Sequence, residues 1–160
     1  MKKVRHILTF AYSYLQVILT GTVVFQTFLM YPNIFRDPPA SLQLSMKFFS
    51  AVTPADFFPP FGSLVVATAI PAVVLAFRDR PAFHLLLGSV LLLLAGDGIL
   101  SILYFWPLNE ALFTEGLSRY NAETLKEFAV DFQHAHHLRL LTSLVSSVLA
   151  MLGLMRCRFK

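Results

Sequence analysis

The stretch that decides the fold is residues 127–155, which reads EFAVDFQHAHHLR and continues directly as LLTSLVSSVLAMLGLM. Its second part, residues 140–155, carries no charge, whereas the first part holds acidic residues, three histidines and Arg139. Charge and imidazole therefore stand where a membrane helix would leave the hydrocarbon. Polar groups at membrane depth are costly, and they usually mark function. Four apolar segments of this kind make up most of the chain.

The composition predicts a small all-α membrane protein. The chain has 160 residues, of which 56% are hydrophobic and 14% are charged, and its mean hydropathy is +0.65. A soluble domain of this size is far less apolar. No basic stripe with interleaved aromatics accompanies the net charge of +4, so we expect no nucleic-acid partner. The single cysteine, Cys157, excludes an internal disulfide and a cysteine-based metal site.

Four segments are long enough to cross a bilayer, which takes about 20 helical residues. We predict one domain, residues 1–160, with spans at about 6–30, 61–77, 82–106 and 138–155. This is an integral membrane antiparallel four-helix bundle in contact with the lipid bilayer. The first apolar stretch is too long for a cleaved signal peptide, so we expect it to be retained.

The basic residues predict the topology. They group at both termini and at one tight turn, as Lys2, Lys3, Arg5, Arg78, Arg80, Arg156, Arg158 and Lys160. By the positive-inside rule both termini are cytoplasmic, and we expect the bacterial inner membrane. Residues 32–60 and 107–137 then form extracytoplasmic loops.

The outer loops have predicted structure of their own. Residues 41–52 place apolar side chains at helical spacing, which predicts a short interfacial helix acting as a lid. Pro59 and Pro60 predict that the second membrane helix begins only after them. Asn121 predicts an N-cap, so that the fourth helix begins outside the hydrocarbon and runs through Arg139 into the bilayer.

Asp97 lies near the middle of the third span, in the sequence LLAGDGIL. A carboxylate there costs about 2.5 to 3.5 kcal/mol, so it should face the bundle. Three interpretations compete: a hydrogen-bond node to hydroxyls of other spans, a proton-handling or ligand-binding acid, and an ion-pair partner of an arginine. The flanking Gly96 and Gly98 indicate close approach by a helix or a ligand.

The histidines of the fourth helix allow two kinds of chemistry. Asp131, His134 and His137 share one face at three-residue steps, while His136 and Arg139 share another. A metal or haem site through His134 and His137 is one alternative, but it would need further ligands from elsewhere. A substrate-facing general base or hydrogen-bonding pair is the other. A third interpretation is that the histidines lie at the membrane interface without a specific role.

Small residues in the third and fourth spans predict close helix packing. They also leave room for an alternative function, a non-catalytic accessory or assembly subunit that packs against another membrane protein or a second copy. At the outer end of the third span, Trp106 belongs to an aromatic belt and Asn109 follows Pro107. Asn33 follows Pro32 in the same way. No Ser-His-Asp order, phosphate loop or flavin or nicotinamide fingerprint is present, so no cofactor is expected.

Four stretches carry a family likeness: residues 21–32, ending in Pro32; VTPADFF at 52–58; PLNEAL at 107–112; and HLR at 137–139, followed by LTSL at 141–144. They resemble the anthrone oxygenase-like family of small four-helix integral membrane proteins, much of which is a domain of unknown function. The likeness spans most of the chain, and the last two motifs are the most specific.

The resemblance implies oxidation of a phenolic anthrone to an anthraquinone by molecular oxygen, without metal or flavin. By position it implies His137 as the base, with Arg139 and Asn109 holding the anion. We therefore expect a pocket near the outer leaflet that binds a small aromatic or quinone-like molecule. Its predicted substrate-binding residues are Asn33, Asp97, Trp106 and His136.

Overall fold

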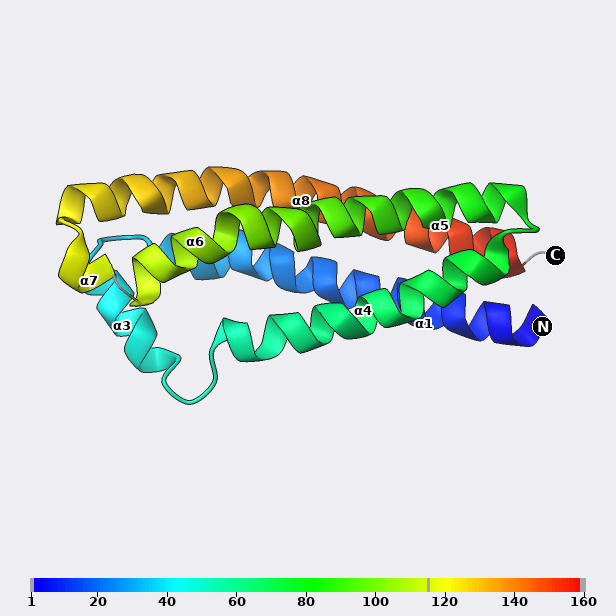
Figure 1. Ribbon diagram of the computed structural model, residues 1–160, viewed down its shortest axis with the longest axis horizontal. Helices are drawn as coiled ribbons and strands as arrows, with labels where there is room; N and C mark the ends of the chain where they lie inside the picture. Colours follow the sequence, from blue (N-terminus) through cyan, green and yellow to red (C-terminus); the bar gives the residue numbers. More distant parts are fainter. Residues whose placement is uncertain (1, 115, 159–160) are drawn as a thin grey trace.

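The chain folds into four long helices that lie side by side along the molecule (Figure 1). The computed structural model describes residues 2–114 and 116–158, which contain no strand. The four helices long and apolar enough to cross a membrane are Lys2–Ile34, Pro54–Ala76, Arg80–Thr114 and Ala122–Cys157. Both termini lie at one end of the molecule, and the two short helices α3 and α7 lie at the other (Figure 1).

Two of the long helices contain π-helical turns. The first consists of α1 (Lys2–Phe25), the π-helical segment η1 (Gln26–Met30) and α2 (Tyr31–Ile34). The third consists of α5 (Arg80–Leu93), η2 (Leu94–Ile99), η3 (Ser101–Phe105), α6 (Trp106–Asn109) and η4 (Glu110–Thr114). The remaining elements are α3 (Ala40–Phe48), α4 (Pro54–Ala76), α7 (Gly116–Arg119) and α8 (Ala122–Arg158). α8 packs against α1 and α5, and α4 packs against the same two helices.

The start of α4 corrects the predicted break at Pro59 and Pro60. The helix begins at Pro54 behind a capping box, in which the Thr53 backbone N–H donates to Asp56 Oδ2 at 2.8 Å. Each proline removes one bond to the carbonyl four residues earlier. Those carbonyls belong to Ala55 and Asp56, which are exposed in the first turn. The helix therefore continues, because the freed carbonyls remain accessible to solvent.

Pro32 and Pro107 do not end their helices either. Each follows a π-helical segment by two residues, and the residue before each proline donates to the carbonyl five residues back: Tyr31 N–H to Gln26 O, and Trp106 N–H to Ser101 O. The hydrogen-bond pattern thus changes just before the proline, which itself has no N–H to donate. We expected the outer loops to begin at Pro32 and Pro107, but both residues lie within helices, α2 and α6.

The fourth helix begins as predicted. The Asn121 Oδ1 accepts from the Thr124 backbone N–H at 2.9 Å, and one helix runs on from Ala122 to Arg158. With 37 residues it is about 55 Å long at about 1.5 Å per residue. Most of residues 107–137 is consequently helical rather than irregular. The short helix of the first loop, α3, ends at Phe48 instead of residue 52 and buries Leu42 against α2 and η4.

The interior of the described part of the chain has two apolar clusters and a set of buried hydroxyl groups that join helices. One cluster, toward the termini, includes Tyr12, Leu86 and Ala150. The other, toward α3 and α7, includes Tyr31, Phe105, Phe132 and other rings. Alongside the first cluster, α1, α5 and α8 are joined by a polar seam of interhelical hydrogen bonds from buried hydroxyls: Ser13 to Ala150 O, Thr20 to Ser143 O and Ser89 to Ser146 O.

The two glycines beside Asp97 have different surroundings. A Cβ added to Gly96 would overlap the side chain of Thr142 on α8, whereas a Cβ added to Gly98 would meet nothing within 4 Å. Gly96 therefore permits close approach of α8, whereas Gly98 has open space where a side chain would be.

This contrast gives a matched pair of variants. We expect Gly96→Ala to lower the free energy of unfolding by about 1–3 kcal/mol, the usual cost of overpacking. Gly98→Ala should leave stability unchanged or raise it by up to about 1 kcal/mol, since alanine favours helix. Unfolding curves of both purified variants in the same detergent test this. Equal losses in the two variants would show that Gly96 does not set the distance between η2 and α8.

Candidate functional site

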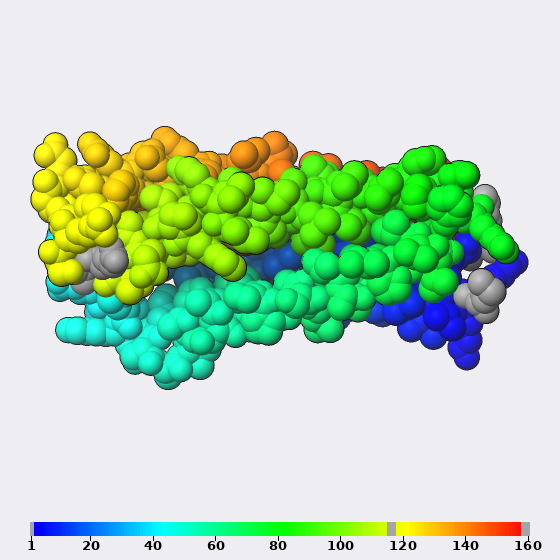
Figure 2. Space-filling view, in the orientation of Figure 1, coloured from blue at the N-terminus to red at the C-terminus, as the bar shows by residue number. Residues whose placement is uncertain are grey.

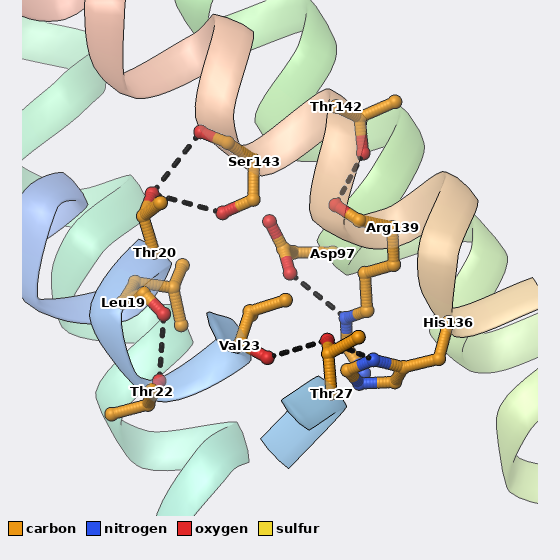
Figure 3. A network of polar contacts seen from close by, with 10 residues as sticks. All are labelled: Leu19, Thr20, Thr22, Val23, Thr27, Asp97, His136, Arg139, Thr142 and Ser143. Carbon is orange, nitrogen blue, oxygen red and sulfur yellow. Dashed lines mark hydrogen bonds and ion pairs between the residues drawn. The ribbon is translucent and has the colours of Figure 1, made fainter. Parts of the chain in front are cut away.

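The candidate site lies where three π-helical segments face α8. Thr27 comes from η1, Asp97 from η2, and Phe105 from η3, and all three contact His136 or Arg139 of α8. Figure 3 shows Thr27 of η1 and Asp97 of η2 pointing toward His136 and Arg139, which both belong to α8. Wide π turns are rare and frequently occur at functional sites, because they redirect side chains that an α-helix would place elsewhere.

A buried ion pair joins two helices at this level. Arg139 Nε donates to Asp97 Oδ1 at 2.9 Å, and the two side chains are 13% and 8% exposed. The guanidinium also stands over the Phe105 ring, 5.1 Å from its centroid. Of the three interpretations of Asp97, the structure shows the ion pair with an arginine. One oxygen of the carboxylate, Oδ2, is left over.

His136 is held in a single orientation by a hydroxyl. Its ring is 1% exposed, and its Nδ1 lies 2.9 Å from Thr27 Oγ1. Thr27 Oγ1 donates its one proton to the carbonyl of Val23 at 2.7 Å. The hydroxyl must then accept from the imidazole, which places the proton of the neutral ring on Nδ1. Nε2 is consequently the nitrogen with a free lone pair.

Aromatic rings enclose the imidazole. Tyr31 and Phe105 meet it edge to face, with centroids 4.6 and 5.7 Å away, and Phe132 stacks on it at 6.1 Å. These rings leave His136 only 1% exposed. Electrostatic interactions are stronger in such surroundings than in water.

Three buried polar atoms at this level have no hydrogen-bond partner within the described part of the chain. They are His136 Nε2, Asp97 Oδ2 and Ser101 Oγ. Ser101 lies on the same helix between Asp97 and Phe105, four residues from each, and so shares their face. Buried polar atoms are nearly always bonded, and exceptions call for a ligand, a water or a catalytic role.

The structure separates the sequence-predicted residues into two groups. It brings together Asp97, His136 and Arg139. His137 is exposed on another face of α8, where its Nδ1 donates to Gln133 O at 2.7 Å. Trp106 is 54% exposed.

The two predicted asparagines differ in their surroundings. Asn33 is exposed and donates to Leu29 O, one turn back on its own helix. Asn109 is half-buried in α6. Within the described part of the chain, neither asparagine side chain forms a hydrogen bond with His136 or Arg139.

The alternative metal set is not brought together. Asp131, His134 and His137 are all exposed on α8. Among residues 2–114 and 116–158, no group of three or more His, Cys, Asp or Glu side chains could hold a metal ion.

Several site residues were not predicted from the sequence: Thr27, Tyr31, Ser101 and Phe132. A signal for Thr27 was present, because the polar residues of the first span recur on one helical face as Thr9, Ser13, Gln16, Thr20 and Thr27.

No family model, no curated protein and no solved structure matches this chain.

The ion pair generates a prediction about stability. We expect Asp97→Asn and Arg139→Gln each to lower the free energy of unfolding by about 3–5 kcal/mol, because each strands a buried charge. The double variant should lose much less than the sum of the two losses. A double-mutant cycle from detergent unfolding curves measures this coupling, with the exposed Asp131→Asn as control. Additive losses would mean that the two groups do not stabilise each other.

Proposed function

We propose that the chain is an integral membrane protein that crosses the bilayer four times with both termini in the cytoplasm. Four apolar helices of sufficient length support this. The termini and the α4–α5 turn lie at one end (Figure 1), which carries Lys2, Lys3, Arg5, Arg78, Arg80 and Arg156. Such a basic end is expected on the cytoplasmic side. α3 and α7 then lie at the outer surface, in our proposal that of a bacterial inner membrane.

Cysteine labelling tests the topology. In a Cys157→Ser background, a membrane-impermeant maleimide added to intact bacterial cells should label Glu123→Cys and spare Arg78→Cys, both of which are exposed positions. Permeabilised cells should show labelling of both. Labelling of Arg78→Cys alone in intact cells would invert the proposed orientation.

We further propose that the cluster around His136 and Arg139 binds a small aromatic molecule with oxygen substituents, such as an anthrone or a quinone. The observation that carries this proposal is an aromatic shell around His136 next to a buried ion pair, with three polar atoms at this level that lack a hydrogen-bond partner within the described part of the chain. A hydroxyl of the ligand can donate to His136 Nε2 or Asp97 Oδ2, and a carbonyl of the ligand can accept from the Ser101 hydroxyl. The rings of the ligand suit the aromatic surroundings.

An approach to this level is visible on one face of the molecule. Figure 2 shows a hollow between α4 and the segment from η2 to α6, with the residues of α1 at its floor. Gly98, next to Asp97, leaves further open space. An apolar ligand dissolved in the outer leaflet could enter laterally from the lipid.

The chemistry that this arrangement suits is oxidation of an acidic aromatic C–H by molecular oxygen. His136 Nε2 takes the proton from the methylene carbon opposite the ketone, and Arg139 holds the negative charge that develops on the ketone oxygen. Oxygen adds to that carbon, and the returned proton gives a hydroperoxide. Loss of the remaining C–H proton and cleavage of the O–O bond then release water, so that anthrone and O₂ become anthraquinone and H₂O.

This proposal assigns the base to a different histidine from the one that the family resemblance implies. His137 is exposed and its Nδ1 proton is committed to a backbone carbonyl. His136 is buried beside Arg139, and its free nitrogen is Nε2. The adjacent histidines thus form a matched pair for testing.

The test is anthrone oxidation by the purified protein in lipid nanodiscs, followed by quinone absorbance and oxygen uptake against empty nanodiscs. We expect His136→Ala to reduce the rate by about 10²–10⁴-fold, the usual contribution of a general base. His137→Ala should retain the wild-type rate. Arg139→Lys should lose activity, since one ammonium cannot replace the planar guanidinium that also bonds Asp97.

The outcomes separate the competing functions. Loss of activity in His137→Ala alone would favour the assignment from the resemblance. Wild-type protein that forms no quinone and binds no anthrone would contradict the oxygenase proposal and favour the accessory-subunit alternative.

A further inference from the structure

A second group of unpartnered polar atoms lies deep in the bundle, away from the candidate site. The side chain of Gln16 on α1 is 0% exposed, and neither its Nε2 nor its Oε1 has a hydrogen-bond partner within the described part of the chain. An amide left unbonded at membrane depth costs several kcal/mol. Gln16 is a long way from either end of its 33-residue helix.

The hydrogen bonds on either side locate Gln16 within the polar seam. Ser13 donates to Ala150 O at 3.0 Å, and Thr20 donates to Ser143 O at 3.1 Å. Gln16 falls between these two points on α1, and Ser146 falls between them on α8. Gln16 is therefore at the level of Ser146, and its burial shows that its side chain lies in the interior of the bundle.

The hydroxyls at this level have already committed their protons. Ser89 donates to Ser146 O at 2.7 Å, and Ser146 donates to Ser89 O at 2.8 Å, so the two serines bond each other's backbone reciprocally. Tyr12 OH lies 2.6 Å from Ser89 Oγ and must be the donor there. These hydroxyls offer lone pairs but no further proton.

Gln16 consequently needs a donor for its carbonyl oxygen that its neighbours cannot supply. The ligand must be small, because the residue is fully enclosed, and it must be neutral, because these neighbours carry no charge that could balance an ion. It must donate one hydrogen bond to Oε1, and it can accept another from Nε2.

We propose that Gln16 binds an internal water molecule. Water has two protons and two lone pairs, so it can donate to Oε1, place its second proton on a hydroxyl oxygen, and accept from Nε2 or another donor. A buried water typically makes about three hydrogen bonds of this kind. Bound there, it joins the Tyr12–Ser89–Ser146 network to the Ser13 and Thr20 bonds and makes the polar seam continuous.

A structure of the full chain in lipid, at a resolution that shows ordered waters, tests the proposal. We expect a density peak about 2.7–3.2 Å from Gln16 Oε1. In Gln16→Leu the peak should be lost while the Ser13–Ala150 and Thr20–Ser143 contacts remain. A peak that persists in Gln16→Leu, or an Oε1 that accepts from a protein group, would overturn the proposal.

A second measurement needs no variant. In protein labelled with ¹⁵N-glutamine, the Gln16 side-chain NH₂ should show a cross-peak to water with the sign of a long-lived contact. The side chain of Gln26, which is also buried, serves as the comparison. A cross-peak that arises only from exchange with bulk water should appear at both glutamines. No cross-peak at Gln16 would reject the bound water even if the leucine variant does not fold.

Discussion

The ion pair between Asp97 and Arg139 is the constraint on which the middle of the structure depends. A charge buried among apolar helices is tolerated only when a partner neutralises it. Here Arg139 Nε lies 2.9 Å from Asp97 Oδ1. The pair thereby fixes the register of η2 against α8. His136 lies one turn before Arg139, so the same register places its ring among Tyr31, Phe105 and Phe132.

Hydroxyl groups extend this constraint toward the termini. Serine and threonine side chains on α1, α5 and α8 donate to backbone carbonyls of a neighbouring helix rather than only to their own. Such bonds, together with small side chains, hold helices together where lipid provides no hydrophobic driving force. α4 is held differently: Ala69, Ala72 and Ala76 pack it against the apolar cluster. The side-chain hydrogen bonds described for α4 stay within that helix and its cap.

The general organisation could be predicted from the sequence because it depends on local patterns. The length of the apolar segments predicted the four long helices, and the capping side chain of Asn121 predicted the start of α8. The boundaries at Pro32, Pro59 and Pro107 could not be predicted, since they depend on whether the freed carbonyls are exposed or the preceding turn is π-helical. π turns have no simple sequence signal, and they decide where Thr27, Asp97 and Phe105 point.

The choice between the two adjacent histidines follows from helix geometry more than from motif position. Residues two apart on an α-helix differ by about 200° in direction, so His137 and Arg139 cannot both face the bundle. Residues three apart differ by about 60°, so His136 and Arg139 can. The guanidinium is fixed inward by Asp97, and that single contact determines which imidazole accompanies it. The ion pair is a structural element, and it also places His136 rather than His137 beside the guanidinium in the interior of the bundle.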